Sequence, residues 1–286
     1  MKVGLDCLPC VMRQALEAAR AATTDEALQR QVLYEVAQLI PRFPLDVSPP
    51  ELGQRVYRLI TQFTGNSDPY REKKRKANET ALELYPRLKE VVNASEDRLL
   101  AACKFAIAGN SLDLGSQSEY PEPESLLDTA LALPFAFDDY QQFRANLKSS
   151  SLILYLGDNA GEVAFDRVLV EEIRQMSQAR IYFVVRQRPV INDATLEDAR
   201  FVGLDKVARV IANGSDAPAT ILSQCSEELL RLYRSADLII SKGQGNFETL
   251  NEERRNIFFL LRVKCSVVAK FLGAEVGQAV LKRGGL

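Results

Sequence analysis

The sequence predicts an α/β protein with a mostly parallel sheet, preceded by a helical N-terminal region. Its 286 residues, 47% of them hydrophobic, are enough to bury a substantial core. Apolar residues recur at helical spacing in the first part of the chain, whereas the second part alternates short apolar runs with helical patterns. Such alternation is typical of parallel βαβ units. We therefore expect a helical region over residues 1–115 and an α/β core over residues 116–286, packed as one compact unit.

Five helices are expected in the first part of the chain. Pro41 closes the second helix and Pro49-Pro50 opens the third. Pro86 is expected to bend the fourth. Residues 116–150 are expected to form a loop and short helices. The five predicted helices cover residues 11–23, 23–43, 49–65, 68–92 and 95–110.

Five strands are expected from residue 151 onward. The first, SLILYLG, is a continuous apolar run of the kind found in strands that are buried on both faces. Helical patterns separate several of the strands, and one of these helices begins at Thr195, a typical N-cap residue. The predicted strands are 151–157, 180–186, 207–214, 237–243 and 256–265, and the predicted helices between them are 162–177, 195–203 and 226–236.

Charge and composition exclude several classes of function. The net charge is −2, from 36 basic and 38 acidic residues, so the chain lacks the basic excess that binds nucleic acids or anionic membranes. No apolar run is long enough for a membrane span, and the start MKVGLDCLPC lacks the basic-then-apolar pattern of a secretory signal. We expect a cytoplasmic protein that binds neither nucleic acid nor membrane. Its oligomeric state is not predicted.

The chain contains no histidine. This absence excludes Ser-His-Asp and Cys-His catalysis, and it excludes the usual catalytic zinc sites with histidine ligands. In an enzyme of this composition, acid/base catalysis must fall to Asp, Glu, Lys, Tyr or a metal-bound water.

Polar residues that suit ligand binding follow four of the predicted strands. Ligands of open parallel sheets bind at the carboxyl ends of the strands, so these residues are expected to share one edge. They include oxygen donors, cations and glycines. In chain order they are Gly157, Asp158 and Asn159; Arg186, Arg188, Asn192 and Asp193; Asn213, Gly214 and Asp216; and Ser241 to Asn246.

Three of these residues, Asp158, Asn159 and Asp193, are hard oxygen donors that suit Mg²⁺ or Mn²⁺. Lys242, beside Gly243, would offer an ammonium group and approachable backbone N–H groups to a phosphate. A divalent cation and a lysine at one edge indicate phosphoryl chemistry. Each motif also has a structural alternative: a tight turn in GDNAG, an N-cap in NDAT, and a glycine-rich segment without Walker spacing in SKGQGN. The prediction therefore depends on their convergence.

The five cysteines are an odd number and do not suggest a disulfide framework. Cys7 and Cys10 form a CxxC pair, which is either structural or used for metal or redox chemistry. No second CxxC and no histidine are present to complete a zinc site. Cys103, Cys225 and Cys265 lie in apolar surroundings and are expected in the core.

The basic run REKKRKANE, residues 71–79, is either a phosphate or nucleic-acid patch or, as is more common, a solvated helix face. The segment DPY and the following Lys74 and Asn78 are expected to do more than cover the surface, because they belong to one of six motifs that occur together.

These six motifs are, in order, CLPC, DPYREKKRKANE, GNSLDLG, GDNAGE, PVINDATLEDA and SKGQGNFETL. Together they resemble the prokaryotic branch of the damage-control phosphatases, also classified as domain of unknown function 89. The resemblance extends from Cys7 to about Val268. It implies a Rossmann-like, three-layer α/β/α core. It also implies a metal-dependent phosphatase of small phosphorylated metabolites, such as sugar phosphates and damaged or side-product phosphate esters.

The resemblance further implies roles for individual residues. Asp158, Asn159 and Asp193 would hold the metal, which is Mg²⁺ or Mn²⁺, or else Co²⁺ or Ni²⁺. Lys242 would contact the phosphate of the substrate. The resemblance assigns no role to the CLPC pair.

We therefore expect metal-assisted hydrolysis of a phosphate monoester, with a small phosphorylated metabolite as the binding partner. Asp158 serves as a metal ligand, and a metal-bound water is the expected nucleophile. Either Asp198 or Glu162 serves as general acid or base. The residues expected to contact the substrate are Lys242, Gly243, Gly245, Asn110, Asp113 and Arg186.

Two alternative functions fit the same sequence. One is a non-catalytic protein that binds a phosphorylated metabolite or a nucleotide at the same sheet edge. The other is a redox or zinc protein organised by Cys7 and Cys10.

Overall fold

The computed structural model describes residues 1–109 and 123–284. Two of the residues predicted to contact the substrate, Asn110 and Asp113, lie outside this described part.

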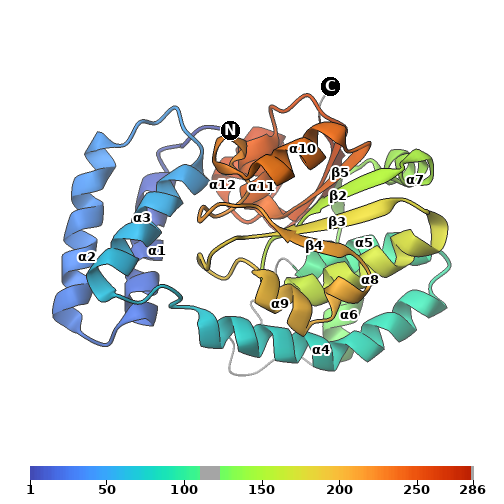
Figure 1. Cartoon of the computed structure of the whole chain (residues 1–286), viewed down its shortest axis with the longest axis horizontal. Helices are drawn as coiled ribbons and strands as arrows, with labels where there is room; N and C mark the ends of the chain where they lie inside the picture. The colour runs from blue at the N-terminus through green and yellow to red at the C-terminus, as the bar shows by residue number, and fades with distance from the viewer. Residues whose placement is uncertain (110–122, 285–286) are drawn as a thin grey trace.

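A seven-stranded sheet forms the centre of the described structure (Figure 1). Its strands lie in the order β1-β7-β6-β5-β2-β3-β4, and neighbouring strands are parallel except β6 and β7, which are antiparallel. This sheet confirms the predicted α/β fold. The strands are β1 (Phe135–Asp138), β2 (Leu152–Leu156), β3 (Arg180–Val185), β4 (Arg209–Ala212), β5 (Leu238–Lys242), β6 (Ile257–Arg262) and β7 (Ala279–Arg283).

The five strands predicted from the sequence are present as β2 to β6. The prediction missed β1 and β7, which extend the sheet beyond β6. β1 lies where a loop and short helices were expected. Three of its four residues are partly buried and the fourth is exposed, so they show no long apolar run. The predicted last strand was also too long, because β6 ends at Arg262 and a helix begins at Ser266.

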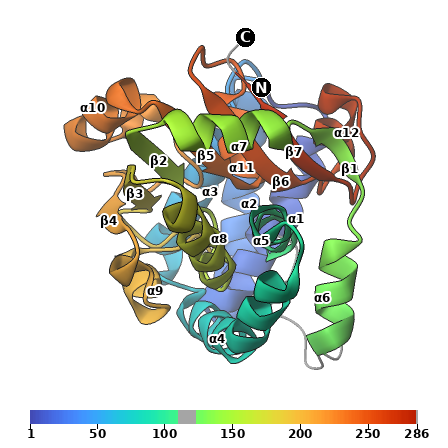
Figure 2. The same ribbon diagram turned by 90° about the vertical axis from the view of Figure 1, so that its right-hand side faces the viewer.

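Helices cover both faces of the sheet and produce three layers (Figure 2). α5, α8 and α9 lie on one face with α4 outside them, and α10, α11 and α12 lie on the other. Every residue of β2 and β5 is buried, which explains the continuous apolar run of β2 and the three apolar residues that begin β5. The helices are α4 (Arg71–Ala94), α5 (Arg98–Gly109), α6 (Pro123–Leu131), α7 (Tyr140–Ser149), α8 (Glu162–Met176), α9 (Leu196–Phe201), α10 (Glu227–Ser235), α11 (Gly243–Leu250) and α12 (Ser266–Leu272).

Three further helices, α1 (Cys7–Ala22), α2 (Glu26–Leu39) and α3 (Pro49–Thr64), form a group at one end of the molecule (Figure 1). They share an apolar cluster of their own. α1 begins earlier than predicted, so the CLPC segment forms its first turn. α4 runs without interruption through Pro86.

Helix α3 contacts the carboxyl edge of the sheet. Arg58 donates from Nε and Nη2 to the two carboxylate oxygens of Asp216, at 2.8 and 2.7 Å. Gln54 Nε2 donates to Asp216 Oδ1 and to Gln224 Oε1, both at 2.6 Å. Because Asp216 follows β4, the three-helix group is attached at the edge where ligands of such sheets bind.

The connections between strands reverse direction at the centre of this edge. From β2 the chain continues to β3 and β4 on one side, whereas from β5 it continues to β6 on the other. The neighbours β2 and β5 therefore flank the topological switch point, the usual ligand site of an open α/β sheet. Asp158 follows β2 and Gly243 follows β5, so both lie at this point.

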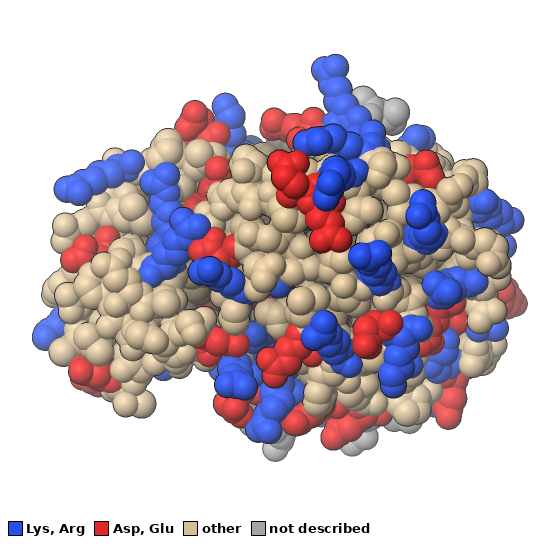
Figure 3. Space-filling model, viewed as in Figure 1, with Lys and Arg blue, Asp and Glu red and all other residues tan. Residues whose placement is uncertain are grey.

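On the face shown in Figure 3, basic and acidic side chains are interspersed, so this face carries no continuous field of one sign. Within residues 1–109 and 123–284, no helix combines the length and apolarity needed to cross a membrane. The expected absence of nucleic-acid and membrane partners stays a prediction.

Candidate functional site

Backbone pairing joins the segments that follow β2 and β3. Asn159 and Asp193 form an isolated antiparallel bridge. The N–H of Ala194 donates to the carbonyl of Asp158 at 2.8 Å. The three predicted metal ligands, Asp158, Asn159 and Asp193, therefore lie on two adjoining segments of main chain.

Side-chain hydrogen bonds orient the oxygens of this group. The amide nitrogen of Asn159 donates to Asp158 Oδ2 at 3.0 Å and to Glu162 Oε2 at 3.1 Å. Asp193 Oδ2 accepts from Arg186 Nε at 2.6 Å. None of the described residues donates a hydrogen bond to Oδ1 of Asn159 or to Oδ1 of Asp193. Both of these oxygens therefore remain available to a cation.

Burial, together with the negative charges of Glu162 and Asp193, raises the pKa of Asp158 to about 7. The positive charges of Lys264 and Arg186 oppose this effect. Carboxylates that repel one another in a buried site would be stabilised by a divalent cation between them.

The donor chemistry of this group fits a hard divalent cation, for which two carboxylates and an amide oxygen, with waters, are suitable ligands. Within the described ranges, no three His, Cys, Asp or Glu side chains gather in a way that could hold a metal ion. The predicted set contains only two such side chains, so it depends on the amide of Asn159 as its third donor.

Gly243 packs directly against the carboxyl group of Asp158. Its φ is +80°, and a Cβ atom there would lie 1.9 Å from Asp158 Oδ2. α11 begins at Gly243, so SKGQGN comprises the end of a strand and the first turn of a helix. The N–H groups of a first helical turn have no acceptor within the helix and favour anions. Gly245, in the same turn, packs against Ala219, which a Cβ atom would approach to 3.1 Å.

We expect the Gly243→Ala variant to lose about 2 kcal/mol more unfolding free energy than a Gly273→Ala control. Both glycines have positive φ, +80° and +72°, so both substitutions strain the backbone. Only at Gly243 does the new methyl group meet the Asp158 carboxyl, because nothing lies within 4 Å of a Cβ at Gly273. Denaturant unfolding of both variants measures the difference, and equal losses would contradict the packing argument.

Lys242, predicted to contact phosphate, is fully buried. Its Nζ donates to Glu162 Oε1 and to Asp166 Oδ1, both at 2.5 Å, and Tyr155 also donates to Asp166 Oδ1 at 2.7 Å. Burial by itself would lower the pKa of Lys242. Attraction to the carboxylates of Asp166 and Glu162 has the larger effect, so the pKa is raised. The structure therefore places this cation behind Asn159, linked to it through Glu162. The predicted contact with phosphate stays a prediction.

Arg186 is also buried, and its guanidinium group makes hydrogen bonds to several residues of the site. Besides Asp193, it reaches the carbonyl of Gly157 at 3.4 Å and Asn246 Oδ1 at 3.5 Å. Asn246 in turn donates to the carbonyls of Gly157 at 3.1 Å and Lys242 at 2.8 Å. These bonds connect the ends of β2, β3 and β5.

Asp198 makes hydrogen bonds that hold neighbouring segments of the site in place. Its Oδ2 accepts from the N–H and hydroxyl of Thr195 at 2.8 and 2.7 Å, which completes the N-terminal capping box of α9. Its Oδ1 accepts from Asn78 Nδ2 at 2.8 Å. Asn78 Oδ1 accepts from the N–H of Gly161 at 2.6 Å, so α4 holds the turn that contains Asn159. Lys74, buried on the same helix, pairs with Asp68 at 3.0 Å.

Sequence reasoning missed several residues of the site. Lys264 lay inside the predicted strand 256–265, but β6 ends at Arg262, so Lys264 follows the strand and its charge acts on Asp158. Ala219 donates its N–H to Asp193 Oδ2 at 3.3 Å and has a φ of 65°. Ile191, two residues before Asp193, has a φ of 47°. Strained backbone of this kind often accompanies functional sites, but no residue type signals it in a sequence.

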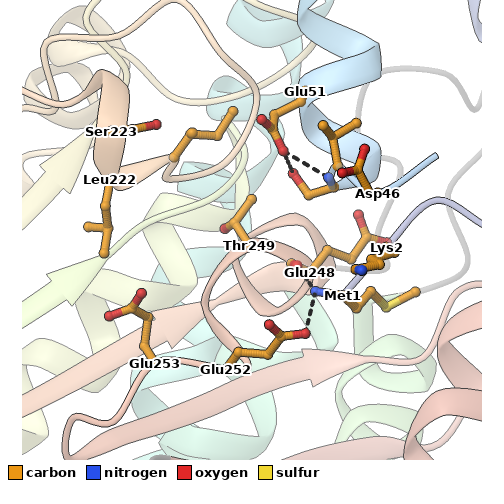
Figure 4. Close-up of a pocket in the computed structure, with 13 residues that line it drawn as sticks. Met1, Lys2, Asp46, Glu51, Leu222, Ser223, Glu248, Thr249, Glu252 and Glu253 are labelled. Carbon is orange, nitrogen blue, oxygen red and sulfur yellow. Dashed lines mark hydrogen bonds and ion pairs between the residues drawn. The ribbon is translucent and has the colours of Figure 1, made fainter. Parts of the chain in front are cut away.

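A cavity of about 330 Å³ opens between the start of α3 and the end of α11 (Figure 4). None of the predicted site residues lines it. Its lining is acidic and includes Asp46, Glu51, Glu248, Glu252 and Glu253. Burial raises the pKa of Glu248 to about 7, against the opposing effects of its hydrogen bond from Gln244 and of the N-terminal amino group.

Glu248→Gln is expected to stabilise the protein at pH 8 by up to about 3 kcal/mol. A carboxyl whose pKa is raised from 4.5 to about 7 by folding destabilises the folded state once it ionises. This cost grows between pH 4.5 and 7, so the advantage of the variant should disappear as the pH falls toward 4.5. Urea unfolding across this pH range measures the effect, with the exposed Glu252→Gln as control. A gain that does not depend on pH would contradict the assignment.

Comparison with known proteins identifies the family. The damage-control phosphatase ARMT1-like domain matches residues 4–280 of the chain. This chain belongs to that family. The resemblance inferred from the six motifs is thereby confirmed.

Relatives within the damage-control phosphatase family are similar over almost their whole length. A damage-control phosphatase of Pyrococcus horikoshii is 34% identical, with 99% of this chain and 98% of the relative covered. One from Archaeoglobus fulgidus is also 34% identical, with 99% of both chains covered. The crystal structure of a DUF89 family protein from Pyrococcus horikoshii matches with a TM-score of 0.92 and 35% identity, covering 99% of both chains. Family membership therefore supports a phosphatase.

Proposed function

We propose that this protein is a metal-dependent phosphatase that hydrolyses phosphate monoesters of small metabolites. Its substrates would be sugar phosphates or damaged and side-product phosphometabolites. The observation that carries the proposal is the pairing of the segments after β2 and β3, which juxtaposes Asp158, Asn159 and Asp193 at the switch point of the sheet. Membership in the damage-control phosphatase family supports the same reaction.

In this proposal, Asp158, Asn159 and Asp193 hold one divalent cation, Mg²⁺ or Mn²⁺, or else Co²⁺ or Ni²⁺. The bound ion supplies Lewis-acid polarisation of a phosphoryl oxygen and neutralises charge there. Arg186 fixes the orientation of Asp193 through its 2.6 Å hydrogen bond. Because Arg186 is buried and bonded to Asp193, we assign it to positioning this carboxylate, and its predicted contact with substrate stays a prediction.

The phosphate group would be bound by N–H groups of the first turn of α11, from Gly243 to Gly245. This turn begins against Asp158, and a helix N-terminus favours an anion. Lys242 adds positive charge directly behind the turn. For Lys242 to contact the phosphate itself, its ammonium group would exchange one of its carboxylate partners for a phosphate oxygen.

Of the two groups predicted for proton transfer, we assign the role to Glu162. Glu162 lies beside Asn159 and accepts hydrogen bonds from both Asn159 Nδ2 and Lys242 Nζ. Asp198 instead accepts from Thr195 and Asn78, and Asn78 binds the N–H of Gly161, so we assign Asp198 to positioning the turn before α8. This division of roles places proton transfer at the same end of α8 as the metal ligands.

The proposal is tested with chelator-treated protein and a panel of sugar phosphates together with an aryl phosphate. Phosphate release should be absent without metal and should return with Mn²⁺ or Mg²⁺. Release that persists after chelation would contradict the metal role. Binding of sugar phosphates without any turnover, in the presence of each metal, would contradict catalysis and favour a phosphometabolite sensor.

A further inference from the structure

Three of the five cysteines lie where the three-helix group meets the α/β core. Cys7 and Cys10 form the first turn of α1, and Cys265 immediately precedes α12. Gly4 packs against Val267, whose Cγ1 would lie 3.3 Å from a Cβ at Gly4, and this contact brings the two helix starts together. All three thiols are free and partly exposed, whereas Cys103 is fully buried. Cys265 and Cys225, both expected in the core, are only partly buried and lie at its margin.

The sulfur of Cys10 is approached by two N–H donors on the next turn of α1. Arg13 Nη2 lies 3.8 Å from Cys10 Sγ, and Gln14 Nε2 lies 3.7 Å from it. A guanidinium group and an amide N–H are groups that stabilise negative charge on a sulfur. Cys10 is therefore the thiol of this cluster best placed to act as a nucleophile.

Cys7 has different surroundings. Burial raises the pKa of its thiol, as do the nearby groups Glu248, Cys265 and Cys10, against the effect of a backbone hydrogen bond near Gly4. Burial therefore disfavours a thiolate at Cys7, whereas the two N–H donors lie beside the sulfur of Cys10. An unequal pair of this kind, one attacking sulfur and one resolving sulfur, is the arrangement that thiol–disulfide exchange uses.

The helix also sets the distance between the two cysteines. Residues three apart on a helix have Cβ atoms about 5 to 6 Å apart, and a disulfide requires about 3.8 Å. At the first turn of a helix, where four N–H groups lack helical acceptors, small backbone adjustments close this gap without breaking helical hydrogen bonds. Within the described residues, no His, Cys, Asp or Glu cluster of three could hold a metal ion here. The redox alternative for the CxxC pair is therefore favoured over the zinc alternative.

We propose that Cys7 and Cys10 form a reversible dithiol–disulfide site whose oxidant is a low-molecular-weight disulfide of the glutathione type. The Cys10 thiolate attacks one sulfur of the small disulfide, forms a mixed disulfide and releases one thiolate. The Cys7 thiol then gives its proton to water, attacks the Cys10 sulfur and releases the second thiolate. Two electrons pass from the protein to the small disulfide, which is reduced to two thiols. Reduction follows the same steps in reverse.

This inference goes beyond the proposed phosphatase, and its test uses a readout that does not involve phosphate release. The full-length reduced protein is equilibrated with mixtures of reduced and oxidised glutathione, quenched with acid, alkylated and digested with trypsin. The tryptic peptide of residues 3–13, VGLDCLPCVMR, contains Cys7 and Cys10 and no other cysteine. We expect this peptide to escape alkylation and to become lighter by two hydrogen atoms. Cys103 and Cys225 should remain reduced in the same mixtures.

Three variants test the order of the steps. Cys7→Ser should trap glutathione on Cys10, because no resolving thiol remains. Cys10→Ser should react with the small disulfide at least about tenfold more slowly than Cys7→Ser. Arg13→Leu should slow the trapping reaction of Cys7→Ser, whereas Cys103→Ser, a buried-thiol control, should leave the oxidation of residues 3–13 unchanged.

Several results would overturn the proposal. One is a peptide of residues 3–13 that stays reduced in mixtures that oxidise a reference CxxC protein. Another is a disulfide that joins residues 3–13 to the peptide of residues 265–270, which would assign the resolving role to Cys265. A third is bound zinc that protects both thiols from alkylation in the protein as purified.

Discussion

The Asp158→Asn variant is expected to lose about 10³-fold in kcat/KM for phosphate monoesters in the presence of Mn²⁺. Asparagine has the shape of aspartate and can still accept the hydrogen bond that Asn159 Nδ2 makes at 3.0 Å. It lacks the charge that would hold a divalent cation. Steady-state kinetics of phosphate release measure the loss, with the exposed Asp205→Asn as the matched control. Activity within about tenfold of the unsubstituted protein would contradict the ligand role of Asp158.

Unfolding experiments separate this effect from a loss of structure. Burial, with the charges of Glu162 and Asp193, raises the pKa of Asp158 to about 7 in the absence of metal. An acid whose pKa is raised by folding destabilises the folded state as it ionises, and here the cost grows from pH 3.8 to about 7. Without metal at pH 8, Asp158→Asn should therefore be at least as stable as the unsubstituted protein. With saturating Mn²⁺, only the unsubstituted protein should gain stability.

Lys242→Met is expected to lower the unfolding free energy by about 3 to 5 kcal/mol, because removing one member of a buried ion pair leaves its partners uncompensated. Two carboxylates, those of Glu162 and Asp166, depend on the Lys242 ammonium at 2.5 Å. Asp166 also has one oxygen, Oδ2, that is buried without a hydrogen-bond partner. Denaturant unfolding at pH 8 measures the loss, with the exposed Lys270→Met as the control of matched chemistry.

A second variant shows whether charge causes this loss. Adding Glu162→Gln and Asp166→Asn to Lys242→Met removes both uncompensated charges and should restore more than half of the stability. It should not restore phosphate release, because Glu162 and Lys242 both belong to the proposed site. A single Lys242→Met variant as stable as the unsubstituted protein would contradict the buried network.

The central strands were predictable because their physical environment leaves a clear pattern. β2 and β5 are buried on both faces, so β2 is hydrophobic throughout and β5 begins with three apolar residues, and turn residues mark their ends. β1 and β7 are short and partly exposed at their ends, so their apolar residues do not stand out from loop sequence. Their place in the sheet depends on pairing with residues far away in the chain, which no local pattern contains.

The candidate site was predictable to a similar degree. The rule that ligands bind after the strands pointed to Asp158, Asn159, Asp193 and Gly243, because the carboxyl ends of parallel strands meet at one edge. The same rule did not indicate how deeply a side chain is buried. Lys242 and Arg186 are buried and bound by protein groups, and a sequence gives no measure of such burial.

Other parts of the site had no readable signal. The N–H of Ala219 contributes through the backbone, which any residue type supplies. Asn78 reaches Gly161 and Asp198 from a distant helix, so its role appears only when α4 packs on α8. Its motif predicted more than a surface role, and in the structure Asn78 binds Asp198 and the N–H of Gly161.

The central claim is that Asp158, Asn159 and Asp193 share one divalent cation. Anomalous X-ray diffraction from crystals grown with Mn²⁺ tests this claim most directly. We predict one strong peak at the switch point between β2 and β5, within about 2.3 Å of one oxygen from each of the three side chains. A peak that contacts only one of the two aspartates, or a Mn²⁺ ion bound elsewhere while this position holds only water, would contradict the account.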